Sequence, residues 1–174
     1  LMLGSGAPRH VNFLMTSTVW RGHALRWVYR WMRALPLSTL GGNRDALRAA
    51  RALLAQGEVL GVFPEGGISR DGQLMLGSPG AVSLVLGEGV PVVPCGILGA
   101  HAMLPFGARK LRRSGIVLRF GAPLSPEDLV AGAGTSRKER LAVATRRIMR
   151  ELARLVDQPA REDVLEALAE RRAV

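Results

Sequence analysis

The stretch Gly61-Val-Phe-Pro-Glu-Gly-Gly-Ile-Ser-Arg-Asp-Gly72 decides the fold, because it joins an apolar run to a polar loop rich in glycine. The run that leads into it, residues 59–63, has the length and composition of a buried strand. In the loop, glycines let backbone N–H groups approach a ligand closely, and an arginine can donate two hydrogen bonds to one phosphate. The candidate ligand-binding residues of the loop are Glu65, Gly66, Gly67, Ser69 and Arg70. Glu65 also has a structural interpretation, in which its carboxylate accepts backbone N–H bonds and holds the loop.

Strand-like and helix-like segments alternate on both sides of this stretch. Further apolar runs predict strands at residues 11–15, 90–98 and 116–120. Helices are predicted at residues 19–35, 44–55, 79–86, from Ser125 onward, and at 136–156 and 161–172. The alternation predicts an α/β fold: a mixed, mostly parallel sheet flanked by helices, with C-terminal helices. We expect residues 1–130 to form the α/β domain and residues 135–174 a helical extension, joined by the Ala-Gly linker at residues 131–134.

Capping residues predict where several helices begin and end. Asn43 is the expected N-cap of the second helix, and Gly57 its stop. Ser78 stands before a proline, which suits the first position of the next helix. Ser136 and Glu139 have the spacing of a capping box at the start of the long C-terminal helix. The charge runs of the C-terminal helices are typical of solvated faces, and we assign them no chemistry.

Composition limits the classes of protein and partner. The 174 residues carry a net charge of +10, which favours anionic partners such as phospholipid head groups or phosphorylated substrates. The single cysteine, Cys95, excludes an internal disulfide and suits a reducing compartment. No run of 18 apolar residues is present, so the chain as given is expected to be soluble or peripheral, with spans upstream left open.

Two motifs resemble the glycerophospholipid acyltransferase family, the enzymes that acylate glycerol-3-phosphate and lysophosphatidic acid. The first is Phe63-Pro-Glu-Gly66 with Ser69 and Arg70, which matches the Phe-Pro-Glu-Gly-Thr-Arg-Ser-Arg block that binds the acceptor phosphate in that family. The second is Val90-Pro-Val-Val-Pro94, which matches a later apolar block. The resemblance covers roughly residues 1–125. It implies an acceptor site formed by the loop residues named above.

The chain departs from the family block at two positions. Gly67 stands where the family has threonine, and Ile68 stands where it has the first arginine. The loss of that arginine suggests an acceptor other than simple glycerol phosphate. A second family block contributes an arginine to the acceptor phosphate, and here Arg44 is a candidate substitute at a helix N-terminus, where backbone N–H groups favour anions. A solvated surface position is the alternative for Arg44.

The resemblance implies a catalytic pair that this chain lacks. Family members use His-x-x-x-x-Asp, in which the histidine takes the proton of the acceptor hydroxyl as that hydroxyl attacks an acyl thioester. None of His10, His23 and His101 is followed by an aspartate at that spacing, so no catalytic residue is assigned. We expect the motif to lie just upstream of Leu1, and the alternative is a family member that has lost its base. The resemblance implies no metal and no cofactor beyond acyl-CoA or acyl carrier protein as the donor.

The predicted helix at residues 19–35 carries every tryptophan of the chain. Trp20, Trp27 and Trp31 share one face, and a stripe of arginines follows another. This pattern suits a helix at an anionic membrane surface or a wall of the acyl channel, and a core helix is the alternative. The basic run at residues 109–113 is either a membrane-facing or a solvated loop.

Two functions follow from these observations. The first is acyl transfer to a lysophospholipid or a glycerol-phosphate-type acceptor by a cytoplasmic protein that is peripheral at the inner face of the cell membrane. The alternative is a non-catalytic module of the same fold that binds anionic lipid through its basic surface. Nucleic acid is not an expected partner, because the aromatic residues lie in one helix and are not interleaved with basic residues on a strand platform.

Overall fold

The computed structural model describes residues 9–16, 34–37, 44–108 and 110–163. Contacts divide the chain into two compact units, Leu1–Phe63 and Pro64–Val174, and each is described by itself. The predicted division into residues 1–130 and 135–174 stays a prediction.

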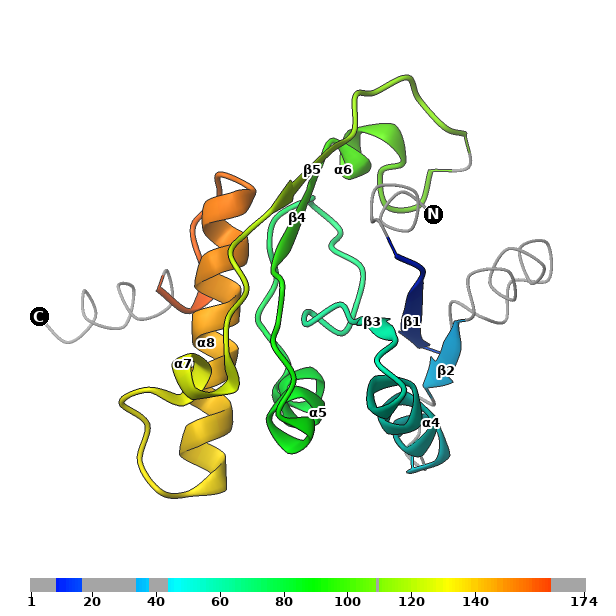
Figure 1. Cartoon of the computed structure of the whole chain (residues 1–174). Helices are drawn as coiled ribbons and strands as arrows, with labels where there is room; N and C mark the ends of the chain where they lie inside the picture. The colour runs from blue at the N-terminus through cyan, green and yellow to red at the C-terminus, as the bar shows by residue number, and fades with distance from the viewer. Residues whose placement is uncertain (1–8, 17–33, 38–43, 109, 164–174) are drawn as a thin grey trace, which may run out of the picture. The chain divides into compact units, whose positions relative to one another are not determined.

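A three-stranded parallel sheet organises the first unit (Figure 1). Its elements are β1 (Val11–Thr16), β2 (Leu35–Leu37), α4 (Arg44–Ala55) and β3 (Val59–Gly61). Strand β1 lies in the middle, with β2 and β3 parallel to it on either side. Val11 pairs with Val59, and Leu14 pairs with Leu35. The parallel pairing of β1 with both β2 and β3, together with helix α4 between β2 and β3, confirms the predicted α/β class.

Strand β2 corrects the predicted end of the helix at residues 19–35. Leu35 lies in a strand, because the proline that follows it disfavours helical backbone at the preceding residue. The rest of that predicted helix, with Trp20, Trp27 and Trp31, lies outside the described residues. Helix α4 has the bounds predicted for it, and Gly57 follows it with a φ of +75°, where a side chain would be strained. Its predicted N-cap, Asn43, also lies outside the described residues.

The second unit contains an antiparallel strand pair and its flanking helices. Its elements are α5 (Pro79–Glu88), β4 (Cys95–Leu98), α6 (Ala100–Met103), β5 (Val117–Phe120), α7 (Pro126–Val130) and α8 (Arg137–Leu155). Cys95 pairs with Phe120, and Leu98 pairs with Val117. The predicted strand at residues 90–98 is shorter than expected, and Val92 makes only an isolated bridge to Leu124. Two prolines in this run, which have no N–H to donate, explain the interruption.

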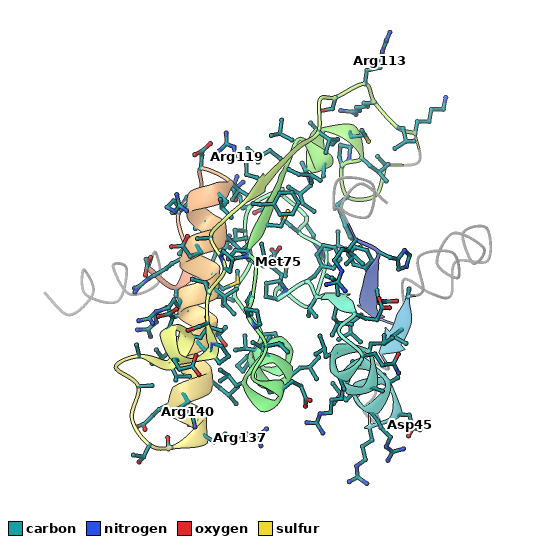
Figure 2. The ribbon with its side chains drawn as sticks, viewed as in Figure 1. Asp45, Met75, Arg113, Arg119, Arg137 and Arg140 are labelled. Carbon is teal, nitrogen blue, oxygen red and sulfur yellow. The ribbon has the colours of Figure 1, made fainter. Side chains whose placement is uncertain are left out.

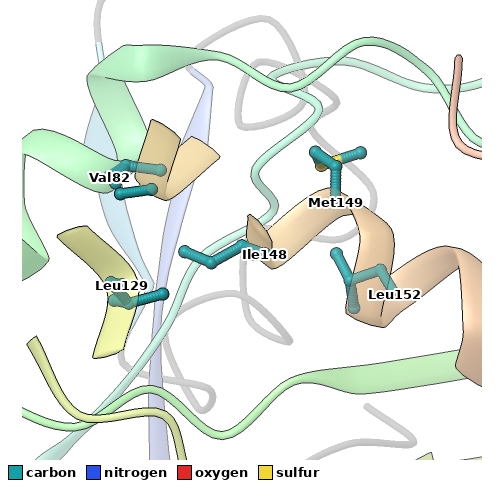
Figure 3. Packing of buried hydrophobic residues seen from close by; sticks show 6 residues of the cluster. Val82, Leu129, Ile148, Met149 and Leu152 are labelled. Atoms are coloured by element: carbon teal, nitrogen blue, oxygen red, sulfur yellow. The ribbon is translucent and has the colours of Figure 1, made fainter. Parts of the chain in front are cut away.

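Helix α8 supplies much of the core of the second unit. Its buried residues Ile148, Met149 and Leu152 pack with Val82 of α5 and Leu129 of α7. Figure 3 shows Val82, Leu129 and Ile148 directed toward one another. The charged face expected for this helix is therefore one side of an amphipathic helix whose other side is core.

Both predicted starts of the later helices are confirmed. Ser136 and Glu139 form the capping box of α8: the Ser136 hydroxyl accepts from the Glu139 N–H at 3.2 Å, and Glu139 accepts from the Ser136 N–H at 3.3 Å. Ser125 begins α7 with the same arrangement, using Asp128 as its partner. Neither these helices nor any other helix within the described ranges is both long and apolar enough to cross a membrane.

Candidate functional site

Five of the predicted acceptor-binding residues lie on one closed loop, residues 64–78, which we call the acceptor loop. The Ser78 N–H donates to the Pro64 carbonyl at 2.7 Å and joins the two ends of the loop. Gly66 and Gly72 adopt positive φ values of +67° and +76°, which glycine reaches without a Cβ clash. These two positions let the chain turn sharply within the loop.

Glu65, which belongs to the acceptor loop, bonds to a residue on the other side of the same loop. Its Oε2 accepts a hydrogen bond from the Met75 N–H at 2.8 Å, across the width of the loop (Met75 is labelled in Figure 2). A carboxylate that accepts from a backbone N–H makes a charge-assisted bond, which is stronger than a neutral one. The structural role expected for Glu65 is confirmed.

Residues that follow α8 also bond to the backbone of the acceptor loop. The Gln158 Oε1 accepts from the Leu74 N–H at 2.7 Å, and the Gln158 Nε2 donates to the Gly72 carbonyl at 3.2 Å. Glu162 Oε1 accepts from the Gly77 N–H at 3.3 Å. These side chains are more than 80 residues away from the loop in sequence. Sequence reasoning missed them, because nothing in the local pattern around Gln158 marks it as a partner of a distant loop.

Two ion pairs fix the segment that carries Gln158. Arg150 of α8 donates to Asp163 from Nη2 at 2.6 Å and from Nε at 3.0 Å, and this hydrogen bonding lowers the pKa of Asp163. Arg119 of β5 donates to Asp157 at 2.5 Å and to the Leu155 carbonyl at 3.1 Å. The segment is thus anchored to a strand just before Gln158 and to a helix just after Glu162.

The acceptor loop also packs directly on α8. A Cβ added to Gly77 would lie 2.6 Å from Thr145 Cγ2 and 2.6 Å from Met149 Cγ. A real side chain there would collide with two helix residues, so glycine is required by close approach. This contact places the second half of the loop against the core of the unit.

The first half of the loop is exposed. Gly66, Gly67, Ile68 and Arg70 are exposed, and the Ile68 side chain is 64% accessible. Among the described residues, no hydrogen bond uses the N–H groups from Gly66 to Arg70. Backbone amides without a partner in the described part of the chain are what an anion-binding loop requires.

Ser69 and Arg70 have local partners. The Ser69 hydroxyl donates to Asp71 Oδ1 at 3.0 Å, and the Gln73 N–H donates to the same oxygen at 3.0 Å. These two bonds, first the backbone one and then the hydroxyl one, lower the pKa of Asp71. The Arg70 guanidinium carbon lies 5.3 Å from the centre of the Phe106 ring, which is within the range of a cation–π contact.

The remaining predicted positions lie elsewhere. Arg44 is exposed at the start of α4 and belongs to the first unit. The binding roles of Arg44 and of the loop residues stay predictions. Cys95 is half-buried in β4, and burial raises the pKa of its thiol, which keeps it protonated at neutral pH. Within the described ranges, no three His, Cys, Asp or Glu side chains are grouped so that they could hold a metal ion.

Comparison with known proteins gives consistent results. A family model described as Acyltransferase matches residues 1–98. The chain is 31% identical over 93 residues to a chloroplastic 1-acyl-sn-glycerol-3-phosphate acyltransferase of Brassica napus. The aligned segment covers 52% of this chain and 27% of that protein. It is 25% identical over 162 residues to a 1-acyl-sn-glycerol-3-phosphate acyltransferase of Bacillus subtilis (strain 168), covering 91% of this chain and 77% of that protein.

A solved structure has a similar fold. The crystal structure of the 1-acyl-sn-glycerophosphate acyltransferase PlsC from Thermotoga maritima superposes with a TM-score of 0.61 at 22% identity, over 84% of this chain and 57% of that one. At this identity the likeness concerns the fold. The chain spans only about a quarter of the length of the Brassica relative.

Proposed function

Because the chain belongs to the acyltransferase family, we propose that it carries the acceptor site of an enzyme that transfers a fatty acyl group to a lysophospholipid or glycerol-phosphate-type acceptor. The matched residues 1–98 include the whole acceptor loop. The observation that carries the proposal is the geometry of that loop: one half is held by Glu65, Gln158 and Glu162, and the other half presents exposed amides and Arg70.

The proposed reaction exchanges a thioester for an ester. The acceptor hydroxyl attacks the thioester carbonyl of acyl-CoA or acyl carrier protein, its proton passes to a base, and the donor leaves as a thiol. No atom changes its oxidation state in this transfer, so the proposal needs no redox cofactor. It includes no metal. None of the loop residues takes the role of the base in this proposal.

Each loop residue has a distinct role in acceptor binding. The exposed amides from Gly66 to Arg70 and the Arg70 guanidinium bind the acceptor phosphate, since both donate hydrogen bonds to an anion. Ser69 holds Asp71 and so shapes the turn next to Arg70. Ile68, at the position of an arginine in the family block, leaves one fewer contact to a bare phosphate and favours an acceptor with a larger head group.

The proposed location is the inner face of the cell membrane, where the protein binds as a peripheral protein. The net charge of +10 supports binding to anionic lipid, because basic proteins are attracted to the negative cytoplasmic leaflet. The tryptophans Trp20, Trp27 and Trp31 suit the interfacial region of a bilayer, or a wall of the acyl channel, by their amphipathic character. The alternative function, a non-catalytic lipid-binding module, has no support from the relatives described above.

An assay of the protein expressed from its complete gene tests this proposal. We expect transfer from radiolabelled acyl-CoA or acyl carrier protein to lysophosphatidic acid or a related lysophospholipid. Arg70→Ala should raise KM for the acceptor about tenfold, which corresponds to the loss of a hydrogen bond to a charged group, and leave KM for the donor unchanged. Arg48→Ala, at an exposed position of α4, is the matched control. Absence of transfer to every lysophospholipid and glycerol phosphate would contradict the proposal.

A further inference from the structure

The loop between α6 and β5 exposes large apolar side chains. Leu104, Phe106 and Leu111 are 48%, 53% and 73% accessible. The Arg112 N–H donates to the Met103 carbonyl at 2.8 Å and closes this excursion, and the Ala108 N–H donates to the Pro105 carbonyl at 3.0 Å within it. The three apolar side chains therefore lie on one short, closed loop. We call the described residues of this loop, 104–108 and 110–113, the docking loop.

The docking loop is also strongly basic. Lys110, Arg112 and Arg113 are exposed, and Figure 2 shows Arg113 extending outward from the loop. No ion pair joins any of these three to an acidic residue in the described part of the chain. Between Gly89 and Pro126 the sequence contains five Lys or Arg residues and neither Asp nor Glu. This surface is therefore complementary to an anionic partner, with no acidic side chain of its own segment to oppose it.

We propose that the docking loop binds the protein to an anionic phospholipid membrane. Exposed leucine and phenylalanine side chains on the same loop as basic ones match the two layers of a membrane surface: the apolar side chains enter the acyl boundary, and the cations pair with head-group phosphates. A nucleic acid would need an aromatic face on which to stack a base, but the Arg70 guanidinium already lies over the ring of Phe106.

Contacts between the docking loop and the acceptor loop give this placement a consequence for catalysis. Arg70 lies over Phe106, and a Cβ added to Gly72 would lie 2.7 Å from the Cγ of His101 in α6, the helix that leads into the docking loop. Binding of the docking loop to a membrane therefore brings the acceptor loop to the lipid surface, where a lysophospholipid acceptor resides. Only this last step rests on the proposed function; the docking itself does not.

Vesicle binding tests the charge component of the proposal. The protein is sedimented with vesicles of phosphatidylcholine alone or of phosphatidylcholine with phosphatidylglycerol. Arg112→Gln with Arg113→Gln should weaken binding to the anionic vesicles about 25-fold, because each basic side chain near an anionic leaflet contributes roughly fivefold. Lys138→Gln with Arg140→Gln on α8 removes the same charge elsewhere on this unit and should change binding less than about twofold. Equal losses from the two pairs would overturn the proposal, since they would show attraction by net charge alone.

A second pair of variants tests the apolar component. Leu111→Ser should weaken vesicle binding several-fold, because the variant no longer buries one apolar side chain in the membrane interface. Val93→Ser, at a position that is 52% exposed outside the docking loop, should have no effect. Thermal unfolding of each variant checks that the fold is retained. The proposal would be overturned if Leu111→Ser left vesicle binding unchanged and RNA displaced the protein from the vesicles as well as free anionic vesicles do. That result would identify a general polyanion-binding surface.

The docking test and the activity test can fail independently. Vesicle binding requires neither an acyl donor nor an acceptor. If the protein expressed from the complete gene is inactive but still binds through the docking loop, the result supports docking and contradicts the proposed function. Conversely, full transfer to a short-chain, water-soluble acceptor together with vesicle binding that is unaffected by the docking-loop variants would leave the proposed function standing and contradict docking.

Discussion

The two halves of the acceptor loop differ in what holds them. The backbone groups of the inner half, residues 72–78, bond to the side chain of Glu65 at the start of the loop and to those of Gln158 and Glu162 after α8. The outer half, residues 66–70, is exposed except at the half-buried Ser69, whose hydroxyl bonds locally to Asp71. An exposed binding segment gains precision when the residues next to it are fixed by a rigid scaffold. The contrast indicates that the inner half positions the loop and the outer half meets the ligand.

The largest expected effect comes from breaking the contact between the inner half and α8. Gly77→Ala places a methyl group against Thr145 and Met149 and should lower the free energy of unfolding by about 2–3 kcal/mol, the usual cost of overpacking. Urea unfolding followed by circular dichroism measures this difference.

Gly67→Ala in the outer half is the matched control. Its φ is not positive, and the nearest atom to an added Cβ, Met75 Cε, is 3.7 Å away, an ordinary contact. Its stability should stay within about 0.5 kcal/mol of the parent protein. Equal destabilisation by the two variants would show that the halves are not held differently.

Removal of the Gln158 side chain should release the inner half. Gln158→Ala leaves the Leu74 N–H and the Gly72 carbonyl without their partner, which costs about 1–3 kcal/mol for partly buried groups. Hydrogen exchange of peptides that cover residues 72–78 should become faster, while exchange of the exposed outer half changes little. Gln158→Glu keeps an acceptor for Leu74 but cannot donate to Gly72, so it should give an intermediate exchange rate.

Gln56→Ala, at an exposed position after α4, serves as the control for Gln158→Ala. It should leave exchange of the acceptor loop unchanged. If Gln158→Ala also left that exchange unchanged, the two hydrogen bonds of Gln158 would not be what holds the inner half.

Much of the fold could be predicted from the sequence, because local rules determine it. Helix ends followed from capping residues such as Ser136 and from Gly57, whose positive φ stops a helix. Strand β2 was missed because it has only three residues. So short an apolar run cannot be distinguished in the sequence from the end of the helical pattern before it. Strand β4 was predicted too long because an apolar run marks burial, whereas its prolines limit the hydrogen-bonded ladder.

The candidate site likewise has a part that the sequence indicates and a part that only the folded chain shows. The loop itself could be recognised in the sequence, since glycine, carboxylate and arginine occur together over a few positions, and the binding roles of its residues stay predictions. Of the residues that hold the loop, Gln158 and Glu162 could not be predicted, because they reach it only after the chain has passed through β4, β5 and α8. A glutamine is a common surface residue, and only the folded chain shows that both ends of its amide are used.

A change in the outer half alone should alter ligand preference without altering stability. Ile68→Arg restores the arginine of the family block at a position that is 64% exposed, so it should leave unfolding within about 0.5 kcal/mol of the parent. In the complete protein it should lower KM for glycerol-3-phosphate about fivefold relative to a lysophospholipid, as one more charge-assisted contact to phosphate would. An unchanged acceptor preference would contradict the proposed role of Ile68.

The smallest expected effect concerns Asp71, at the junction of the two halves. Its pKa is lowered from the ordinary value of 3.8, first by the Gln73 N–H and then by the Ser69 hydroxyl. A lowered carboxyl pKa means that the bonds to the charged form stabilise the turn above the ordinary value and are lost as the pH falls through the lowered one. Ser69→Ala removes one of the two bonds, so the Asp71 titration midpoint, followed by carboxyl carbon NMR, should move up toward 3.8. Asp128, whose pKa is lowered by Ser125 in the α7 capping box, should titrate as before, because its partners are untouched. A midpoint of Asp71 that does not move would mean that the Gln73 N–H alone fixes the turn, and Ser69 would then remain available to a ligand.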